Sequence, residues 1–315
     1  MYEQFFVMFA MIFTGYFLRK IDFIKEEMNN SLNKFIVYCA YPLMLTYNIG
    51  TMDMNSKLFK EFILMMILSG FFMVCSAVFA RIFTKVKKYP DRASNVAEMA
   101  MACPNNGFMG FPMALSFLGA EGLLLMMAQN STLNIFFFTY ALYALRRNNA
   151  EKNKFSIKSV TTATVKVILN PNILGLIVGM FICLTGFPLD NGIDVYMKYI
   201  GGAATPMAMI FIGSTLAGSN FWDMLKNRIV WESSLIKLII IPFAAAIIVN
   251  FLPIPSSLKV ITVLGLSFPT AATVPMLAEQ EHQNHELASK ILFFSTVVSM
   301  ATVPFTITLI KGLLM

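Results

Sequence analysis

Charged residues are scarce in this chain. Asp, Glu, Lys and Arg make up 13% of its 315 residues, against 57% for hydrophobic residues. A soluble domain carries about 25% charged residues, so the composition excludes an ordinary soluble protein. No polar stretch is long enough for a separate soluble domain. Apolar runs long enough to cross a bilayer recur from end to end. The sequence therefore predicts an all-α polytopic membrane protein.

Motifs for catalysis and for cofactors are also missing. The sequence contains no phosphate-binding Gly-x-x-x-x-Gly-Lys-[Ser/Thr] and no Gly-x-Ser-x-Gly nucleophile motif. The four cysteines have no metal-ligand spacing. We therefore predict no enzyme, no metal site and no cofactor, apart from Na+ or H+ as a coupling ion. The formal charge of +7 does not indicate a nucleic-acid partner, because the basic residues follow hydrophobic segments.

Polar or charged residues separate ten hydrophobic segments. The predicted spans are 4–18, 32–50, 59–82, 93–118, 122–144, 164–185, 194–217, 229–251, 257–280 and 287–312. Lys and Arg are retained on the cytoplasmic side of a membrane, and most of them lie in the odd-numbered connections. We therefore expect both termini outside the plasma membrane. The basic 146–166 connection is expected in the cytoplasm, where it can also contact anionic membrane lipid.

The two halves of the sequence match at a common offset. Residues 34–42 parallel residues 198–206, and the same offset relates Gly15 to Gly179 and Ser131 to Ser295. The predicted repeats, 1–150 and 151–315, hold five spans each. Because five is odd, the second must insert in the opposite sense, which gives two inverted five-helix repeats. Such repeats place a transported substrate near the membrane midplane.

Spans 4 and 9 are broken at corresponding places. Proline removes a backbone donor and clashes with the preceding turn, and a lipid-buried helix cannot leave the freed carbonyls unpaired. Two broken helices in matching positions are the best sequence indication of a transporter's binding site. The residues predicted to bind substrate are Asn105, Asn106, Gly107, Pro112, Pro269, Thr270, Thr273 and Pro275.

A break at the midplane creates a helix N-terminus there. Its first N–H groups are unpaired and the helix dipole places partial positive charge on them, so it can bind an anion without Lys or Arg. Asn and Thr are also good N-caps, and neither break contains Lys or Arg. The favoured ligand is a small organic anion. The alternative is that both breaks are structural kinks with capped ends.

Polar residues elsewhere in the spans are candidates for ion or proton coupling. They are Glu98, Asn130, Ser131, Thr132, Ser295 and Thr296. The neutral oxygens can coordinate Na+ or form hydrogen bonds between helices. Glu98 can carry a proton or help hold a cation; alternatively it is a snorkelling residue near the cytoplasmic surface.

Gly175 and Gly179 in span 6 have the spacing of close helix packing. They fit a contact within the chain or the contact of a homodimer.

Three segments resemble the bacterial auxin efflux carrier family, which includes malonate and malate permeases. They are residues 104–112, residues 170–175 and residues 269–280. The family is similar in fold to PIN-type auxin carriers and to bile acid:sodium symporters. The resemblance implies a scaffold of spans 1, 2, 6 and 7 and a transport domain of spans 3–5 and 8–10. It also implies that spans 4 and 9 cross at the substrate, where Asn105, Asn106 and the residues around the prolines contact a carboxylate. The implied transport mechanism is an elevator-type sliding of the transport domain against the scaffold.

We therefore predict a secondary transporter of small carboxylates such as malate or malonate, working by alternating access. The alternatives are a sodium-coupled carrier similar to the bile acid symporters, a non-transporting membrane sensor and an anion channel.

Overall fold

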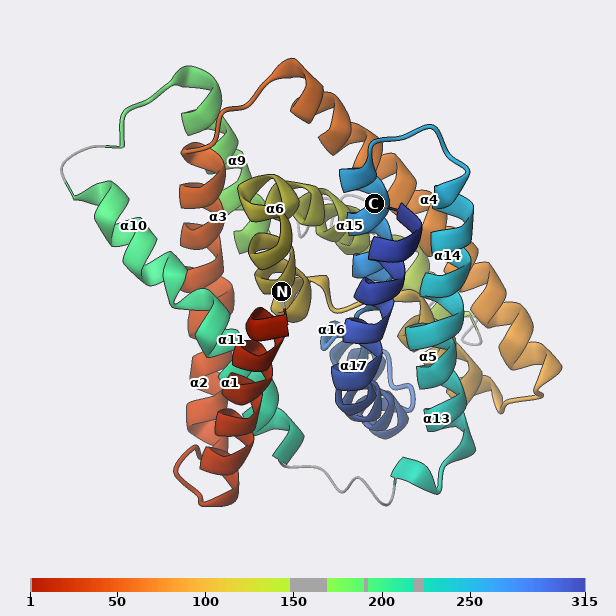
Figure 1. Ribbon diagram of the computed structural model, residues 1–315. Coiled ribbons are helices and arrows are strands. Elements are labelled where there is room, and N and C mark those ends of the chain that lie inside the picture. Colours follow the sequence, from red (N-terminus) through yellow and green to blue (C-terminus); the bar gives the residue numbers. More distant parts are fainter. Residues whose placement is uncertain (1, 148–168, 190–191, 218–223, 315) are drawn as a thin grey trace. The chain divides into compact units, whose positions relative to one another are not determined.

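The computed structural model describes residues 2–147, 169–189, 192–217 and 224–314, which Figure 1 traces as helices and connecting turns. The predicted boundary between the repeats, most of the 146–166 connection and the start of predicted span 6 lie outside these residues. Within them the regular structure is helical, apart from one isolated β-bridge. The all-α prediction is confirmed for the described residues.

Five helical stretches among the described residues are long and apolar enough to cross a membrane. They are Ser56–Val86, Asn106–Arg146, Ile193–Ala217, Arg228–Asn250 and His285–Ile310. The second of these contains a kink at Gly119, where φ is +62° and ψ is −150°. This left-handed backbone favours glycine, and it separates the end of predicted span 4 from the start of predicted span 5.

The chain divides into two compact units, the first made of residues 1–63, 107–127 and 166–219. Its principal helices are α1 (Tyr2–Lys20), α2 (Glu26–Phe35), the π-helix η1 (Ile36–Ala40), α3 (Tyr41–Gly50), α9 (Pro171–Thr185), α10 (Ile193–Gly202) and α11 (Ala204–Ala217). In this unit α1 packs along α11, and α3 packs against α9 and α10.

Glycines let these helices touch backbone to backbone. A Cβ atom added at Gly15 of α1 would lie 2.0 Å from the Ile210 carbonyl oxygen, and one at Gly213 of α11 would lie 1.8 Å from that of Ile12. The spacing of Gly175 and Gly179 serves the same purpose, because both α9 glycines lie against α3. The prediction of packing within the chain is confirmed, and the homodimer contact stays a prediction.

The second unit comprises residues 64–106, 128–165 and 220–315. Its principal helices are most of α4 (Ser56–Val86), α5 (Asp91–Ala102), the end of α6 (Phe111–Phe136), η3 (Phe137–Ala141), α7 (Leu142–Arg146), α13 (Arg228–Leu235), η4 (Ile236–Ile240), α14 (Ile241–Asn250), α15 (Ser256–Ser267), α16 (Thr273–Gln280) and α17 (His285–Leu314). Helix α17 packs against α5, α13, α15 and α16.

Proline explains the wide helical turn η4 in this unit. Pro242 is the second residue after η4. It has no N–H to donate into the preceding turn, where its ring would also collide with the carbonyl four residues earlier. A π-turn relieves this conflict without ending the helix, and such turns are frequent at functional sites. The helix therefore runs from α13 through η4 into α14.

Candidate functional site

The two predicted breaks lie next to each other in the second unit. Helix α5 ends at Ala102 and α15 ends at Ser267. The chain beyond them forms an antiparallel β-bridge between Pro104 and Thr270. The Asn105 N–H donates to the Pro269 carbonyl at 2.8 Å, and the Ala271 N–H donates to the Cys103 carbonyl at 2.9 Å.

This bridge explains how proline can occupy both breaks. Its donors come from Asn105 and Ala271, so the N–H groups that Pro104 and Pro269 lack are not needed. Buried backbone groups must find partners, and each break supplies them to the other. Main-chain pairing between the two breaks therefore supplies these partners from within the protein.

Thr270 ties the bridge to two neighbouring helices. Its Oγ1 donates to the Ala100 carbonyl of α5 at 2.9 Å, and its N–H donates to the Ser295 Oγ of α17 at 3.2 Å. Ser295 in turn donates to the Leu292 carbonyl at 3.0 Å. The structure thus brings together Thr270, a predicted substrate residue, and Ser295, a predicted ion residue.

Thr270→Val is expected to lower the free energy of unfolding by about 1–2 kcal/mol, because the buried Ala100 carbonyl loses its side-chain donor. Thermal unfolding of the purified protein in detergent measures the change. Thr308→Val is the matched control: it removes an exposed hydroxyl that bonds within its own helix. Equal stability of the two variants would contradict the anchoring role of Thr270.

Helical structure resumes just beyond both breaks. The π-helix η2 (Asn106–Gly110) begins at Asn106, and α16 begins at Thr273. The residue that caps α16 is Ala272, which offers no side-chain hydrogen bond, so Thr270 does not act as its N-cap. The reason is that the Thr270 hydroxyl is already bound to α5.

The asparagines of the first break are buried. Asn105 is 7% exposed and Asn106 is fully buried. Neither the Nδ2 nor the Oδ1 atom of Asn106 has a hydrogen-bond partner among the described residues. Buried polar groups of proteins are almost always hydrogen-bonded, so an unpartnered buried amide in a helix break indicates a place for a ligand or water. Thr273 and Pro275, at the start of α16, are partly exposed.

Gly107 and Pro112 belong to the first unit. Pro112 is buried and Gly107 is partly exposed. Their neighbours Phe108 and Phe111 pack on the Tyr41 ring, with ring centroids 5.9 and 5.4 Å apart.

Most hydroxyls of the predicted coupling cluster bond to main-chain carbonyls. Thr132 donates to Met66 at 3.2 Å and to Ala128 at 3.1 Å, and Thr296 donates to Leu292 at 2.7 Å. The Ser131 Oγ has no partner among the described residues, and Asn130 is 7% exposed. The Thr132 bond joins α6 to α4, in line with hydrogen bonding between helices. Ion binding by this cluster stays a prediction.

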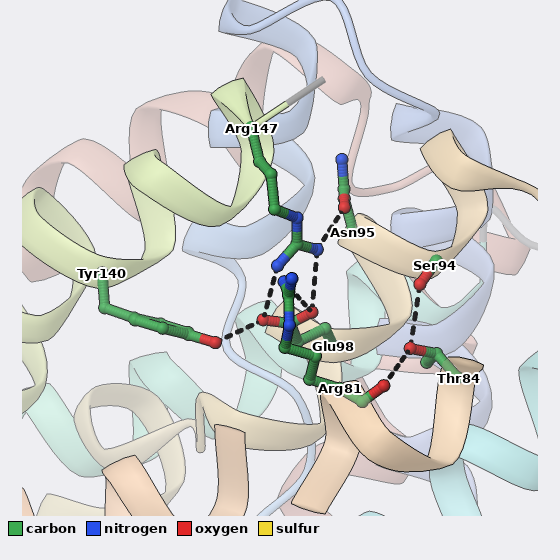
Figure 2. Close-up of polar contacts among 7 residues, drawn as sticks. All are labelled: Arg81, Thr84, Ser94, Asn95, Glu98, Tyr140 and Arg147. Atoms are coloured by element: carbon green, nitrogen blue, oxygen red, sulfur yellow. Dashed lines mark hydrogen bonds and ion pairs between the residues drawn. The ribbon is translucent and has the colours of Figure 1, made fainter. Parts of the chain in front are cut away.

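Glu98 is held in a buried ion-pair network (Figure 2). Its carboxylate accepts hydrogen bonds from the Tyr140 hydroxyl at 2.5 Å and from the Arg147 guanidinium at 2.9 Å. Arg81 adds an ion pair at 4.0 Å, and Asn95 accepts from Arg147. Glu98 is fully buried, so it does not snorkel toward solvent in this structure. A coupling role for Glu98 stays a prediction, and such a role would require it to leave these partners.

Two further buried polar residues lie near the breaks. The Lys237 Nζ of η4 and both amide atoms of Gln129 in α6 have no hydrogen-bond partner among the described residues. Gln129 lies against the backbone of Gly265 in α15. Sequence reasoning did not assign a role to Lys237. The available signal was a single lysine in the apolar run Leu235-Ile236-Lys237-Leu238-Ile239, since charged residues inside spans are rare and functional by default.

Comparison with known proteins identifies the kind of molecule that carries this site. The family model described as membrane transport protein matches residues 1–307. An uncharacterised transporter of Methanothermobacter thermautotrophicus is 24% identical over 298 residues, which cover 94% of this chain and 93% of that protein. An uncharacterised transporter of Methanocaldococcus jannaschii is 22% identical over 305 residues, with 94% of each chain covered.

A third relative has a named substrate. A proposed malonate transporter of Rhizobium meliloti is 27% identical over 313 residues, which cover 96% of this chain and 94% of that protein. The resemblance expected from the sequence is therefore confirmed, and so is the prediction of a transporter in place of an enzyme. Because the family model covers almost the whole length, this multi-pass membrane protein belongs to the auxin efflux carrier family of membrane transport proteins.

Proposed function

We propose that this protein is a secondary transporter of small carboxylates, with dicarboxylates such as malonate or malate as its substrates. The observation that carries the proposal is the pairing of the two helix breaks through Pro104 and Thr270. Helical segments begin just beyond both breaks, at Asn106 and Thr273. Unpaired N–H groups and the helix dipole favour an anion at such ends.

The side chains around the bridge favour the same class of ligand. Asn106 offers an amide donor that nothing in the described chain uses, and an amide can donate to a carboxylate. The proposed malonate transporter of Rhizobium meliloti supports the choice of a small dicarboxylate. The proposed site in the second unit consists of Asn105, Asn106, Pro269, Thr270, Thr273 and Pro275.

The proposed architecture has ten transmembrane segments in two inverted repeats, 1–150 and 151–315. Its spans 1, 2, 6 and 7 form a scaffold, and spans 3–5 and 8–10 form a transport domain that moves as an elevator. The division of the chain into two compact units supports this assignment, with residues 59–63 and 107–127, which group with the first unit, as exceptions. The proposed location is the plasma membrane, with both termini outside, as the distribution of Lys and Arg favours.

Uptake of labelled malonate and malate into proteoliposomes tests the function and the site together. Asn106→Ala and Asn105→Ala are each expected to lower uptake at low substrate concentration about tenfold or more, because a hydrogen bond to a charged group is lost. Asn250→Ala is the matched control, since this exposed asparagine ends α14 in the same unit.

Two outcomes would contradict the proposal in different ways. Wild-type uptake by both Asn105→Ala and Asn106→Ala would remove the site assignment and leave the function standing. A folded wild-type protein that neither takes up these dicarboxylates nor exchanges labelled for unlabelled substrate would contradict the function itself. Flux far above carrier turnover without such exchange would indicate a channel.

A further inference from the structure

Lys237 stands out among the buried residues of the second unit. Its side chain is fully buried, and its Nζ has no hydrogen-bond partner among the described residues. Ser233, which precedes it by four residues in the same helix, is also fully buried with an unpartnered Oγ. An isolated buried ammonium group is very unfavourable unless it is paired. A fully buried lysine without a partner among the described residues therefore indicates a partner from outside the chain.

The position of Lys237 relates it to the first break. Its π-helix, η4, packs against α5, which ends at the break, and against α15, which ends at the second break. Lys237 also lies close enough to the Cys103 thiol for the two groups to interact electrostatically. Cys103 is the residue whose carbonyl accepts the bridge hydrogen bond from Ala271. Lys237 therefore belongs to a helical turn that packs against both helices leading into the paired breaks.

The unpartnered groups around the first break have a common chemical character. Lys237 provides up to three donors and, when protonated, a positive charge, and Asn106 provides an amide. Ligand oxygens that carry negative charge satisfy all of these groups at once. Two separate donors, the Lys237 Nζ and the Asn106 amide, match an anion with two carboxylates better than one with a single carboxylate.

We propose that Lys237 is a substrate-binding residue, whose ammonium group pairs with one carboxylate of a dicarboxylate while the side-chain amide of Asn106 holds the other. This inference rests on the proposed function and extends it, because it names the charged residue of the site and explains a preference for dianions. It also revises the expectation that the anion is held by dipoles and amides without a basic side chain, since Lys237 comes from a helix outside both breaks.

A comparison of two ligands on two proteins tests this inference. Binding of malonate and of monomethyl malonate, which has one carboxylate fewer, is measured by isothermal titration calorimetry in detergent. The wild-type protein is expected to bind malonate about tenfold more tightly or better, as the loss of a charge-assisted contact predicts. In Lys237→Met the affinity for malonate should fall to that for the monoester, which should itself change little.

Two controls accompany the binding measurements. Lys198→Met removes an exposed lysine of α10 in the first unit and should leave both affinities unchanged. The melting temperature of Lys237→Met without ligand should equal or exceed that of the wild type, because an apolar side chain replaces an unpaired buried charge. A lower melting temperature with intact malonate preference would indicate a purely structural lysine and overturn the proposal.

Two further outcomes would contradict the inference about Lys237 or the proposed function. If the wild-type protein binds malonate and its monoester equally, the inference about Lys237 fails while carboxylate binding stands. The same measurement on the wild type decides the matter if Lys237→Met does not fold. If a folded wild-type protein binds neither malonate nor malate, the proposed function fails and the inference fails with it.

Discussion

Glu98→Leu is expected to lower the free energy of unfolding by about 3–5 kcal/mol, the cost of removing one partner from a buried ion pair. The substitution leaves the Arg147 guanidinium, only 15% exposed, without the carboxylate that it contacts at 2.9 Å. It also leaves the Tyr140 hydroxyl without its acceptor. Thermal or chemical unfolding of the purified protein in detergent measures the loss.

The double variant Glu98→Leu/Arg147→Leu shows whether the charge is the cause. Removing both partners takes away the unpaired charge, so the double variant should be more stable than Glu98→Leu alone. Glu286→Gln is the matched control, because Glu286 pairs with Lys290 on the surface of α17 and is 72% exposed. Its stability should match that of the wild type. A Glu98→Leu protein as stable as the control would mean that the network of Figure 2 contributes nothing.

Gly213→Leu is expected to prevent correct packing of α1 on α11. Even the Cβ atom of a new side chain would lie 1.8 Å from the Ile12 carbonyl oxygen, which is backbone and cannot rotate away. The smaller change Gly213→Ala should still cost about 1–3 kcal/mol, as overpacking typically does. Expression, monodispersity in detergent and melting temperature report the effect.

Gly202→Ala provides the matched comparison for Gly213→Ala. It places the same methyl group at the end of α10, where nothing lies within 4 Å. This variant should be as stable as the wild type or slightly more stable, because alanine has a higher helix propensity than glycine. If Gly213→Ala were equally harmless, the close backbone approach of α1 and α11 would not exist in the protein.

The positions of the helix breaks could be predicted from the sequence, because proline acts locally. Pro104 and Pro269 stand inside apolar runs, and a proline there disrupts helical hydrogen bonding whatever surrounds it. The approximate ends of most helices could also be predicted, because polar residues separate the apolar segments. Gly175 and Gly179 indicated close packing, although the sequence did not reveal that Pro42 and Leu45 of α3 lie against them.

The contacts that complete the site could not be predicted, because each joins residues far apart in the chain. Nothing near Pro104 identifies Thr270 as its bridge partner, and Glu98 gives no sign that Arg147 and Tyr140 will surround it. Threonine is a good N-cap, but the sequence could not show that the Thr270 hydroxyl has an acceptor on α5. Lys237 was visible in the sequence, but only the fold shows that its helical turn packs against α5 and α15.

The direct pairing of the two breaks runs through main-chain atoms, while the Thr270 hydroxyl anchors the pair to α5. Both hydrogen bonds that flank the Pro104–Thr270 bridge run from peptide N–H to peptide carbonyl. Side chains next to the bridge can therefore be substituted without breaking these two hydrogen bonds. Substrate preference can therefore evolve by single side-chain substitutions while the main-chain pairing of the two breaks is retained. Redesign for a new anion should begin with those side chains and leave the prolines untouched.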